Sequence, residues 1–441
     1  MHFLIPEPAE FILKRLEENG FEAYVVGGCV RDSFLGITPD DWDITTSATP
    51  EQVKLLFPKT FDTGLKHGTV SVLIHKEIYE VTTFRCDGEY KDNRHPEQVT
   101  FTKSITEDLA RRDFTVNAMA YSPLRGLSDP FCGQEDLKNG IIRCVGEADR
   151  RFHEDALRML RAIRFAAQKG FTIEKSTLDS IERNCHLVKN LSVERIISEL
   201  TKILLSDHLD FFDILYKTGL LQLIMPELCL CFETEQNIKW HIYDVGHHTL
   251  HAVSTLEKKS YLRFAMLMHD WGKPFTKSKN PDGSDCFRNH AKESVRLAEK
   301  FMNRYKFSNS DKDKILRLIK NHDREIVTEK HCVKRAINAV GEDIFLDLLN
   351  VKRADAKAQN FVLTEPRLSV YDKIEELYYE CKRGNEPFSV KNLDINGHDL
   401  IALGYHGKEI GDILNRLLEH VIEHPEDNKK EILIQLTGTV F

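Results

Sequence analysis

Apolar residues recur with two different periods along the chain, and the change of period divides it. Residues 7–19 carry apolar positions at helical spacing and end at Gly20, a favoured residue just after a helix. Residues 24–26, 68–74 and 78–84 are short runs rich in β-branched residues, which is typical of strands. The N-terminal part therefore predicts a small mixed sheet with helices behind it.

Beyond the strands the pattern is mainly helical, so we predict an α+β fold in which an N-terminal head is followed by all-α regions. Glycines and prolines mark breaks between the predicted helices at Gly219, Pro226, Gly384 and Pro387. We expect five regions: a head (1–125), a helical neck (126–205), a helical body segment (206–240), a fourth domain (241–360) and a helical tail (361–441).

The first candidate chemistry lies in the stretch YVVGGCVRDSFLGITPDDWDITT. Its buried strand runs into Gly27 and Gly28, where a backbone without Cβ atoms can turn sharply and approach a ligand, and Arg31 follows within reach of phosphate. Asp41 and Asp43 alternate along the next predicted strand and so project from one face. Paired carboxylates of this kind can hold two magnesium ions. An Asp-x-Asp taken singly is typical of a solvated turn, but its combination with GGxVRD is far more specific.

This combination resembles the signature of class II tRNA nucleotidyltransferases, which are the CCA-adding enzymes and their bacterial poly(A) polymerase relatives. The likeness continues through RRDFTVNA at 111–118, which matches the RRDFTxNA motif of the family, and through most of the 441 residues. It implies addition of C, C and A to tRNA 3′ ends from CTP and ATP. It also implies that Asp41 and Asp43 hold Mg²⁺, and that Gly28, Arg31 and Arg112 hold the triphosphate.

Other residues of the head receive roles on the same basis. Asp113 is expected to orient Arg112, and Asn117 to contact a sugar hydroxyl. Glu80, in the strand predicted at 78–84, is a candidate third acidic group, with an ordinary surface carboxylate as the alternative. The polar stretch between residues 85 and 101 is long enough to move as a lid, and the resemblance implies that a loop here helps to switch nucleotide specificity.

Residues 149–168 predict one helix with an apolar side and a charged side, for which a solvated face is the simpler interpretation. The charged side carries, at intervals of three, Asp155, Arg158, Arg161 and Arg164. Cytosine and adenine both present an amino donor beside a ring-nitrogen acceptor, so a carboxylate beside a guanidinium complements both, but not guanine or uracil. Through its EDxxR motif, the resemblance assigns Asp155 and Arg158 to base selection, and Arg161 and Arg164 to further nucleotide contacts.

Histidines and aspartates beyond residue 241 form a second candidate site. Four of them match the H…HD…D pattern of the HD phosphohydrolase superfamily: His248, His269, Asp270 and Asp355. Imidazole and carboxylate ligands suit Mn, Ni, Fe, Zn or Mg. His290 and His322 fall where two-metal members of that superfamily carry extra histidines, and for each a structural or surface histidine remains the alternative.

The bulk composition is that of an ordinary globular protein, with 41% hydrophobic and 29% charged residues. No stretch approaches the roughly 20 apolar residues of a membrane span, and the N-terminus does not resemble a signal peptide, so we expect a cytoplasmic protein without a membrane partner. The ten cysteines are scattered and are interpreted as reduced thiols. The net charge of −8 argues against an RNA partner unless Lys and Arg cluster locally.

Three alternatives to a full CCA-adding enzyme remain open, as does the oligomeric state. The first is a poly(A) polymerase, or a partial enzyme that adds only CC or only A. The second is a phosphodiesterase or phosphatase whose main activity lies in the HD domain. The third is an RNA-binding protein that keeps the fold without turnover, against which the intact Asp41 and Asp43 argue.

Overall fold

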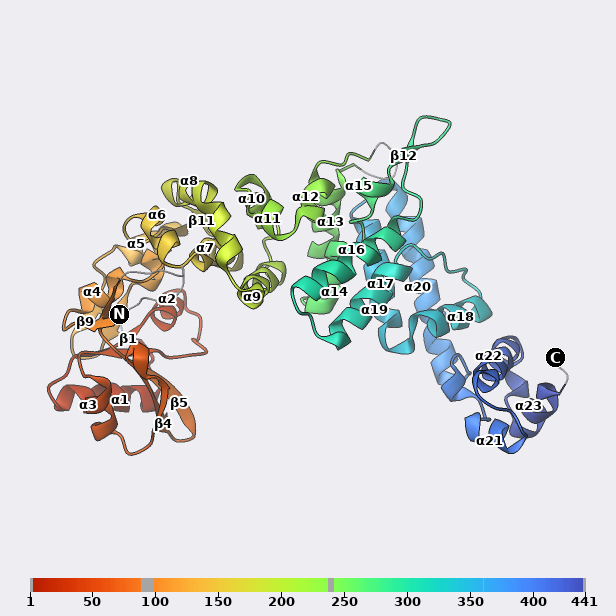
Figure 1. The fold of residues 1–441 in the computed structure, drawn as a ribbon, viewed down its shortest axis with the longest axis horizontal. Coiled ribbons are helices and arrows are strands. Elements are labelled where there is room, and N and C mark those ends of the chain that lie inside the picture. The colour runs from red at the N-terminus through yellow and green to blue at the C-terminus, as the bar shows by residue number, and fades with distance from the viewer. Residues whose placement is uncertain (1–2, 89–98, 237–241, 360, 439–441) are drawn as a thin grey trace. The chain divides into compact units, whose positions relative to one another are not determined.

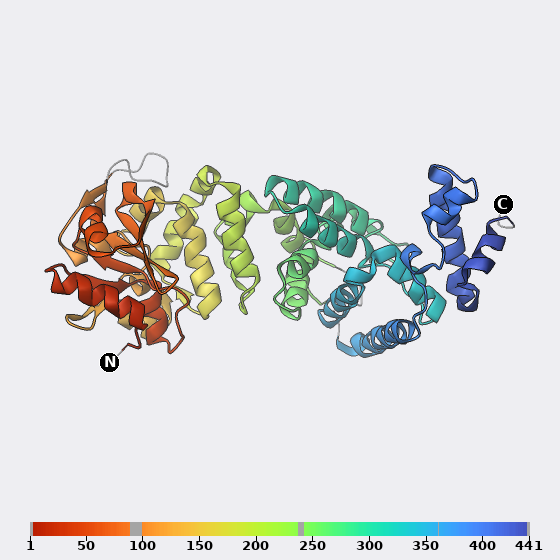
Figure 2. The same ribbon diagram turned by 90° about the horizontal axis from the view of Figure 1, so that it is seen from below.

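The computed structural model describes residues 3–88, 99–236, 242–359 and 361–438. The chain divides into two compact units, Met1–Ile224 (unit 1) and Met225–Phe441 (unit 2). Figures 1 and 2 show a sheet with helices in unit 1 and an assembly of helices in unit 2. The expected α+β class is therefore confirmed. The predicted lid falls largely outside the described residues.

The described part of unit 1 contains a seven-stranded mixed sheet with the order β3-β4-β5-β2-β1-β8-β9. Its strands are β1 (Ala23–Val26), β2 (Ile44–Thr46), β3 (Thr60–Gly64), β4 (Thr69–Ile74), β5 (Glu77–Thr83), β8 (Ala120–Ser122) and β9 (Gly126–Ser128). The β4–β5 hairpin confirms the strand pair predicted around His75-Lys76. Strand β2 pairs in parallel with β5, with Ile44 opposite Val81, whereas the other pairs are antiparallel. This parallel pair brings the chain after Asp43 beside the chain after Glu80.

Helices surround this sheet and continue beyond it. The helices of unit 1 that lie within or next to the sheet in sequence are α1 (Glu7–Glu18), α2 (Gly28–Phe34), α3 (Pro50–Leu56), α4 (Ile105–Ala110) and α5 (Gly133–Asn139). Helix α1 confirms the helix predicted at 7–19, and it buries Ala9, Ile12, Leu13 and Leu16. Phe11, also apolar, is 45% exposed and lies at the edge of the buried side next to Phe57. The shorter strands are β6 (Arg85–Asp87), β7 (Val99–Phe101), β10 (Ile141–Ile142) and β11 (Thr172–Ile173).

The two predicted carboxylates do not lie within a regular strand, as the sequence had suggested. Strand β2 begins at Ile44, one residue after Asp43. The backbone nevertheless continues the ladder, since the amide of Val26 donates to the carbonyl of Asp43 at 3.0 Å. Trp42 is buried between exposed Asp41 and Asp43. The predicted alternation is therefore present, and both carboxylates project on the side away from the core.

The single helix predicted over 149–168 is wrong, because the chain breaks at Asp155. Helix α6 (Ala148–Glu154) ends there, and α7 (Leu157–Lys169) begins two residues later. Asp155 is extended (φ −143°, ψ 104°), and its Oδ1 accepts from the amide of Leu157 at 3.0 Å. A carboxylate that accepts an otherwise unpaired amide at the start of a helix favours such a break. The remaining helices of unit 1 are α8 (Lys175–Asn184), α9 (Val193–Leu204), α10 (Phe211–Lys217) and α11 (Leu220–Ile224).

The described part of unit 2 consists of helices and one short hairpin, as the helical periodicity predicted. Its longer helices are α12 (Pro226–Phe232), α13 (Val245–Ser254), α14 (Ser260–Met268), α16 (His290–Arg304), α17 (Asn309–Asn321), α18 (Lys330–Val340), α19 (Glu342–Lys357), α20 (Phe361–Arg383), α22 (Lys408–Glu423) and α23 (Lys430–Thr437). The shorter elements are α15 (Lys273–Thr276), β12 (Ser278–Lys279), β13 (Asp285–Cys286) and α21 (Gly397–Ala402). Pro226 opens α12 and α20 ends just before Gly384, which confirms two predicted breaks. None of the helices described is both long and apolar enough to cross a membrane.

Candidate functional site

Three carboxylates interact at the edge of the sheet in unit 1. Neighbouring protein atoms partly desolvate the exposed carboxylate of Asp43 and raise its pKa; Arg112 lowers that pKa, and the charge of Asp41 raises it. Partial desolvation also raises the pKa of Glu80, with contributions from Asp43 and Asp41. The structure thus brings Glu80 into one electrostatic cluster with the two predicted aspartates, because strands β2 and β5 run parallel in register.

Carboxylates that raise the pKa of one another are the donor set that a hard cation such as Mg²⁺ neutralises. Among the described residues, however, the groups of three metal-capable side chains with ligand atoms all within 4.8 Å lie in unit 2. The three acids of unit 1 influence the pKa of one another, and a bound cation would neutralise their mutual repulsion.

A tight turn places an arginine next to these acids. Gly27 has φ 81° and ψ −122°, and a Cβ atom added to it would lie 2.7 Å from Nη1 of Arg112. The Nε atom of Arg112 is buried and makes no hydrogen bond within the described part of the chain. Burial lowers the pKa of Arg112. A desolvated guanidinium with an unused donor, packed on a glycine, fits an anionic ligand.

Arg31 is engaged with protein groups. Its Nη1 donates to Oδ1 of Asn117 at 2.6 Å, its Nη2 pairs with Asp32 at 2.7 Å, and its guanidinium lies 5.1 Å from the ring centre of Phe165. Asn117, for which we expected a sugar contact, also donates to Asp113 at 3.1 Å. These contacts hold Arg31 in place beside the glycine turn.

Asp113 contacts Arg161 in place of the expected Arg112. Its Oδ2 accepts from Nε of Arg161 at 2.8 Å, and its Oδ1 accepts from Asn117 and from the amide of Phe114. Burial alone would raise the pKa of Asp113, but the charge of Arg161 and the hydrogen bond from Asn117 lower it to about 2. Asp113 is therefore an ionised anchor between the head and helix α7.

A pocket of about 250 Å³ joins the head to the start of α7. It is lined by Arg111, Arg112, Asp113, Asp155, Leu157, Arg158, Arg161 and Arg195. Four residues that the sequence singled out for nucleotide contacts therefore meet in one pocket. Arg164 is not among them, because its Nε pairs with Glu199 at 2.5 Å and its guanidinium lies over Phe165 at 3.9 Å.

The contacts inside this pocket differ from those the sequence suggested. Oδ2 of Asp155 pairs with Nη2 of Arg195, on α9, at 2.8 Å. Nη1 of Arg158 donates to Glu154 at 2.7 Å, and its Nη2 donates to the carbonyl of Arg111 at 2.9 Å. Sequence reasoning missed Arg195, because it lies 40 residues from Asp155 and no local spacing links the two.

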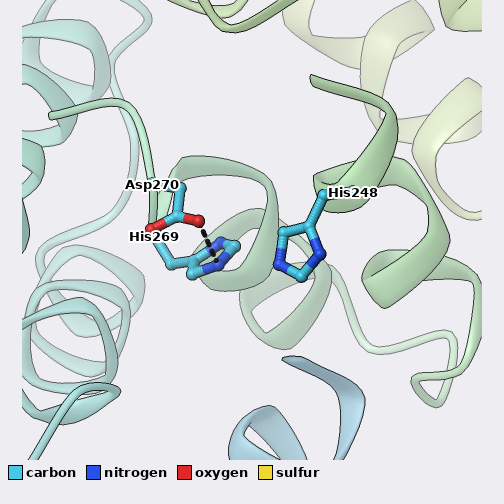
Figure 3. Close-up of side chains that lie close together, drawn as sticks. All are labelled: His248, His269 and Asp270. Atoms are coloured by element: carbon cyan, nitrogen blue, oxygen red, sulfur yellow. Dashed lines mark ion pairs between the residues drawn. The ribbon is translucent and has the colours of Figure 1, made fainter. Parts of the chain in front are cut away.

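The second predicted site is assembled in unit 2 from five helices. His248 lies on α13, His269 and Asp270 follow α14, and Asp355 lies on α19. Figure 3 shows His248 on a neighbouring helix beside the His269–Asp270 pair. Nε2 of His248 is 2.9 Å from Oδ1 of Asp355, and Nε2 of His269 is 3.1 Å from Oδ2 of Asp270 and 3.7 Å from Asp355. The four residues of the HD pattern therefore converge.

The two additional histidines join the same cluster. His290 begins α16 and His322 follows α17; their Nε2 atoms lie 3.4 and 3.8 Å from Oδ1 of Asp270. Asp270 thus belongs to two metal-capable groups, one with His248 and His269 and one with His290 and His322. This is the arrangement expected if one carboxylate lies between two cations.

The Nδ1 atoms of all four histidines are held by backbone carbonyls. Their partners, at 2.6–3.2 Å, are Ala358 for His248, Met266 for His269, Phe287 for His290 and Ile319 for His322. A carbonyl can only accept, so each Nδ1 carries a hydrogen, and each Nε2 is the ring nitrogen that faces the cluster and can coordinate a cation once it is deprotonated.

The Nε2 atoms of His290 and His322 lie 3.1 Å apart. One of these nitrogens can donate a hydrogen bond to the other, and a metal ion bound here would take the place of that proton. Nε2 of His269 is buried and makes no hydrogen bond among the residues described. Burial and the neighbouring histidines lower the pKa of His322 to about 3, whereas Asp270 and Asp355 outweigh burial at His269 and raise its pKa to about 9. The donor set therefore fits transition-metal ions.

A pocket of about 740 Å³ opens beside this cluster. Its wall includes Asp270, His290, His322 and Asp355 from the cluster, together with basic residues from several helices. Lys273 pairs with Asp270 at 2.7 Å and donates to Gln236 at 2.8 Å. His247, next to His248 in the chain, contacts Asp244 and belongs to none of the metal-capable groups among the described residues.

A mixed sheet with a glycine turn and acidic edge, a helical region with an arginine-lined pocket, and a histidine–aspartate cluster define a nucleotidyltransferase joined to an HD domain. The family described as "Poly A polymerase head domain" matches residues 23–143, "Probable RNA and SrmB-binding site of polymerase A" matches 170–231, and "HD domain" matches 240–359.

Curated relatives and solved structures agree with this assignment. A CCA-adding enzyme of Ligilactobacillus salivarius is 36% identical over 436 residues, which cover 96% of this chain and 94% of the relative. A CCA-adding enzyme of Lactiplantibacillus plantarum is 52% identical over 206 residues, 46% of this chain and 51% of the relative. The crystal structure of the Bacillus stearothermophilus CCA-adding enzyme in complex with CTP matches with TM-score 0.72 and 29% identity over 99% of both chains. The chain belongs to the family of CCA-adding enzymes, and it is a tRNA nucleotidyltransferase.

Proposed function

We propose that nucleotide addition takes place where Asp41, Asp43 and Glu80 face Arg112 beside the glycine turn. The observation that carries this proposal is the acidic cluster formed by Asp41 and Asp43, just before β2, with Glu80 on β5, next to a guanidinium whose Nε makes no hydrogen bond within the described part of the chain. The three carboxylates would hold Mg²⁺, which supplies Lewis acidity at phosphate oxygens. CTP and ATP are the proposed donors and the 3′ end of tRNA the acceptor.

The triphosphate is bound at the glycine turn by three groups. Arg112 offers its guanidinium, Gly28 allows the backbone at the start of α2 to approach the phosphates, and Arg31 supplies a second positive charge. Because Asn117 and Phe165 hold Arg31 in place, little side-chain freedom is lost when the anion binds.

Base selection is assigned to Asp155 and Arg158 in the pocket at the start of α7. The carboxylate accepts from the amino group of cytosine or adenine, and the guanidinium donates to the ring nitrogen. Arg195 and the amide of Leu157 contact the two oxygens of Asp155 and so orient the carboxylate. Arg161 lines the pocket and would make a further nucleotide contact. Arg164 does not line the pocket, and its guanidinium packs on the ring of Phe165.

Incorporation of each labelled nucleoside triphosphate into a tRNA transcript without its CCA end tests the proposal. We expect two C and one A with magnesium, and no addition by Asp41→Ala or Asp43→Ala. A long A tail would instead identify a poly(A) polymerase, and addition of only CC or only A a partial enzyme. Binding of the transcript without any incorporation would refute the proposal in favour of an RNA-binding protein.

A second activity, hydrolysis of phosphate esters by the HD domain, is proposed because of the histidine–aspartate cluster. The residues that would hold Mn, Ni, Fe, Zn or Mg are His248, His269, Asp270, Asp355, His290 and His322. In the reaction water adds to phosphorus as the ester P–O bond breaks, and the alcohol leaves with a proton. Hydrolysis of a 2′,3′-cyclic nucleotide that survives Asp43→Ala but not Asp270→Ala would support this activity. Loss in both variants, or in neither, would contradict it.

A further inference from the structure

The lining of the 740 Å³ pocket of unit 2 includes, besides the metal-capable cluster, a set of basic side chains that we call the basic wall. Basic side chains of this wall come from the loop before α16, the loop after α17, α19 and α20: Arg288, Arg324, Lys352 and Arg367. Helix α20 lies beyond residues 240–359, which the HD family matches. Arg367 is therefore a component of the pocket that the HD pattern does not contain.

The guanidinium of Arg367 is held at a set distance from the cluster. It donates through Nη1 to Oε1 of Gln359 and through Nη2 to the hydroxyl of Tyr371 at 3.2 Å. Nε2 of Gln359 in turn donates to Oδ2 of Asp355 at 3.0 Å. Nη2 of Arg367 lies 3.8 Å from that same oxygen, which is too long for a hydrogen bond. An anion that reaches the cluster comes within range of this guanidinium.

A buried lysine fastens the other part of the basic wall. Nζ of Lys352 donates to the carbonyls of His322 and Arg324 at 2.7 and 2.6 Å. These two hydrogen bonds fix the loop after α17. The loop carries His322 of the cluster and, two residues later, Arg324. Arg324 is exposed and lines the pocket, and no acidic partner contacts it among the residues described.

The acidic residues of the pocket do not cancel this charge once cations are bound. Asp270 and Asp355 belong to the cluster, and Asp285 pairs with Lys279 at 2.7 Å. Asp323 and Glu325 remain at the exposed rim. A metal-loaded pocket is therefore positive at its inner end, which attracts a small anion.

We propose that the pocket binds the phosphate group of a nucleotide-sized ester, with Arg367 as its phosphate-binding residue and Arg324 as a second contact. The inference rests on the proposed HD activity and names its substrate class. Phe287, Ile326 and Tyr371 supply an apolar side against which a nucleoside can pack. The volume lies within the roughly 300–1,000 Å³ of small-molecule sites.

Binding of AMP and of inorganic phosphate to the Mn²⁺-loaded full chain, measured by calorimetry, tests this proposal. The variants are Arg367→Ala and Arg367→Lys, with Arg296→Ala as a control that removes an exposed arginine of α16 paired with Glu293. Arg367→Ala removes a charged hydrogen bond to the phosphate, so its affinity should fall roughly 10- to 100-fold. Arg367→Lys should recover part of it, and Arg296→Ala should bind as the unchanged protein does.

Bound manganese is measured for each variant by mass spectrometry of the metal. Weaker phosphate binding with unchanged metal content supports the proposal. Loss of metal together with phosphate would overturn it, because Arg367 would then merely support Asp355. Unchanged affinity in Arg367→Ala, or no binding to the unchanged chain, also overturns it. Ester hydrolysis is followed in parallel: Arg367-dependent phosphate binding without any hydrolysis contradicts only the proposed activity, whereas hydrolysis with unaltered phosphate binding contradicts only this inference.

Discussion

Replacing Gly27 by alanine tests why the turn before α2 requires glycine. The residue has φ 81° and ψ −122°, a conformation that residues with a Cβ atom rarely adopt. The added carbon would also lie 2.7 Å from Nη1 of Arg112. At the neighbouring Gly28 a Cβ atom would meet Nη2 of Arg31 at 3.7 Å, an ordinary contact, and φ is not positive. The two substitutions are chemically identical but differ in strain.

The expected difference follows from these values. Holding alanine in such a conformation costs about 1–3 kcal/mol, and the reduced freedom of the unfolded chain offsets about 0.4–1 kcal/mol. A net loss of roughly 1–2 kcal/mol in the free energy of unfolding is expected for Gly27→Ala. In a domain the size of unit 1, each kcal/mol lowers the melting temperature by about 2–4 °C. We expect a fall of about 2–8 °C for Gly27→Ala, and of less than about 1 °C for Gly28→Ala.

Scanning calorimetry of the full chain measures this difference, with the unchanged protein as the reference. Nucleotide incorporation is measured on the same samples. Gly27→Ala should raise KM for CTP and ATP alike, because it displaces Arg112. Gly28→Ala leaves Arg112 in place, so it should raise KM only to the extent that the added methyl group hinders the approach of the phosphates. Equal melting temperatures for the two variants would refute the reasoning.

Three further predictions concern the anchor, the arginine cluster and the metal site. The pKa of Asp113 falls from 3.8 to about 2, so its ionisation contributes about 2 kcal/mol at pH 7, a contribution present above pH 4 and lost as pH falls towards 2. The stability difference between Asp113→Asn and the unchanged chain in urea should therefore shrink at pH 3; a pH-independent difference would contradict this. Phe165 lies 5.1, 5.2 and 3.9 Å from the guanidinium carbons of three arginines. At about 0.5–1 kcal/mol per contact, the three contacts together are worth about 1.5–3 kcal/mol, so Phe165→Leu should raise KM for CTP roughly 10- to 150-fold, and an unchanged KM would show that the ring only fills space. Asp270→Asn, or a chelator, should remove metal from unit 2 and abolish ester hydrolysis, and incorporation by Asp270→Asn with magnesium should stay normal; retained metal would argue against the cluster.

Much of the fold could be predicted because it depends on local sequence. Glycine at a strand end, β-branched runs and helical apolar spacing led to β1, to the β4–β5 hairpin and to α1, each of which the structure contains. The residues of the HD pattern were also predictable, because they belong to a short motif that few other positions in the sequence match. Local rules failed at Asp155, where helical periodicity continued across a break made by one side chain on the amide of Leu157. Periodicity reports which faces are apolar, but it does not report a hydrogen bond that ends a helix.

By itself the sequence determined which residue types are available: the glycine turn, two of the acids, the arginines and the histidine–aspartate pattern. Tertiary structure decided which of them meet. The parallel pairing of β2 with β5 brings Glu80 to Asp43, α9 brings Arg195 to Asp155, and α20 brings Arg367 to the HD pocket. These partners are far apart in the chain, so no spacing rule can pair them. Their proximity depends on the packing of whole elements, because burial of apolar surface sets that packing and the polar contacts then follow from it.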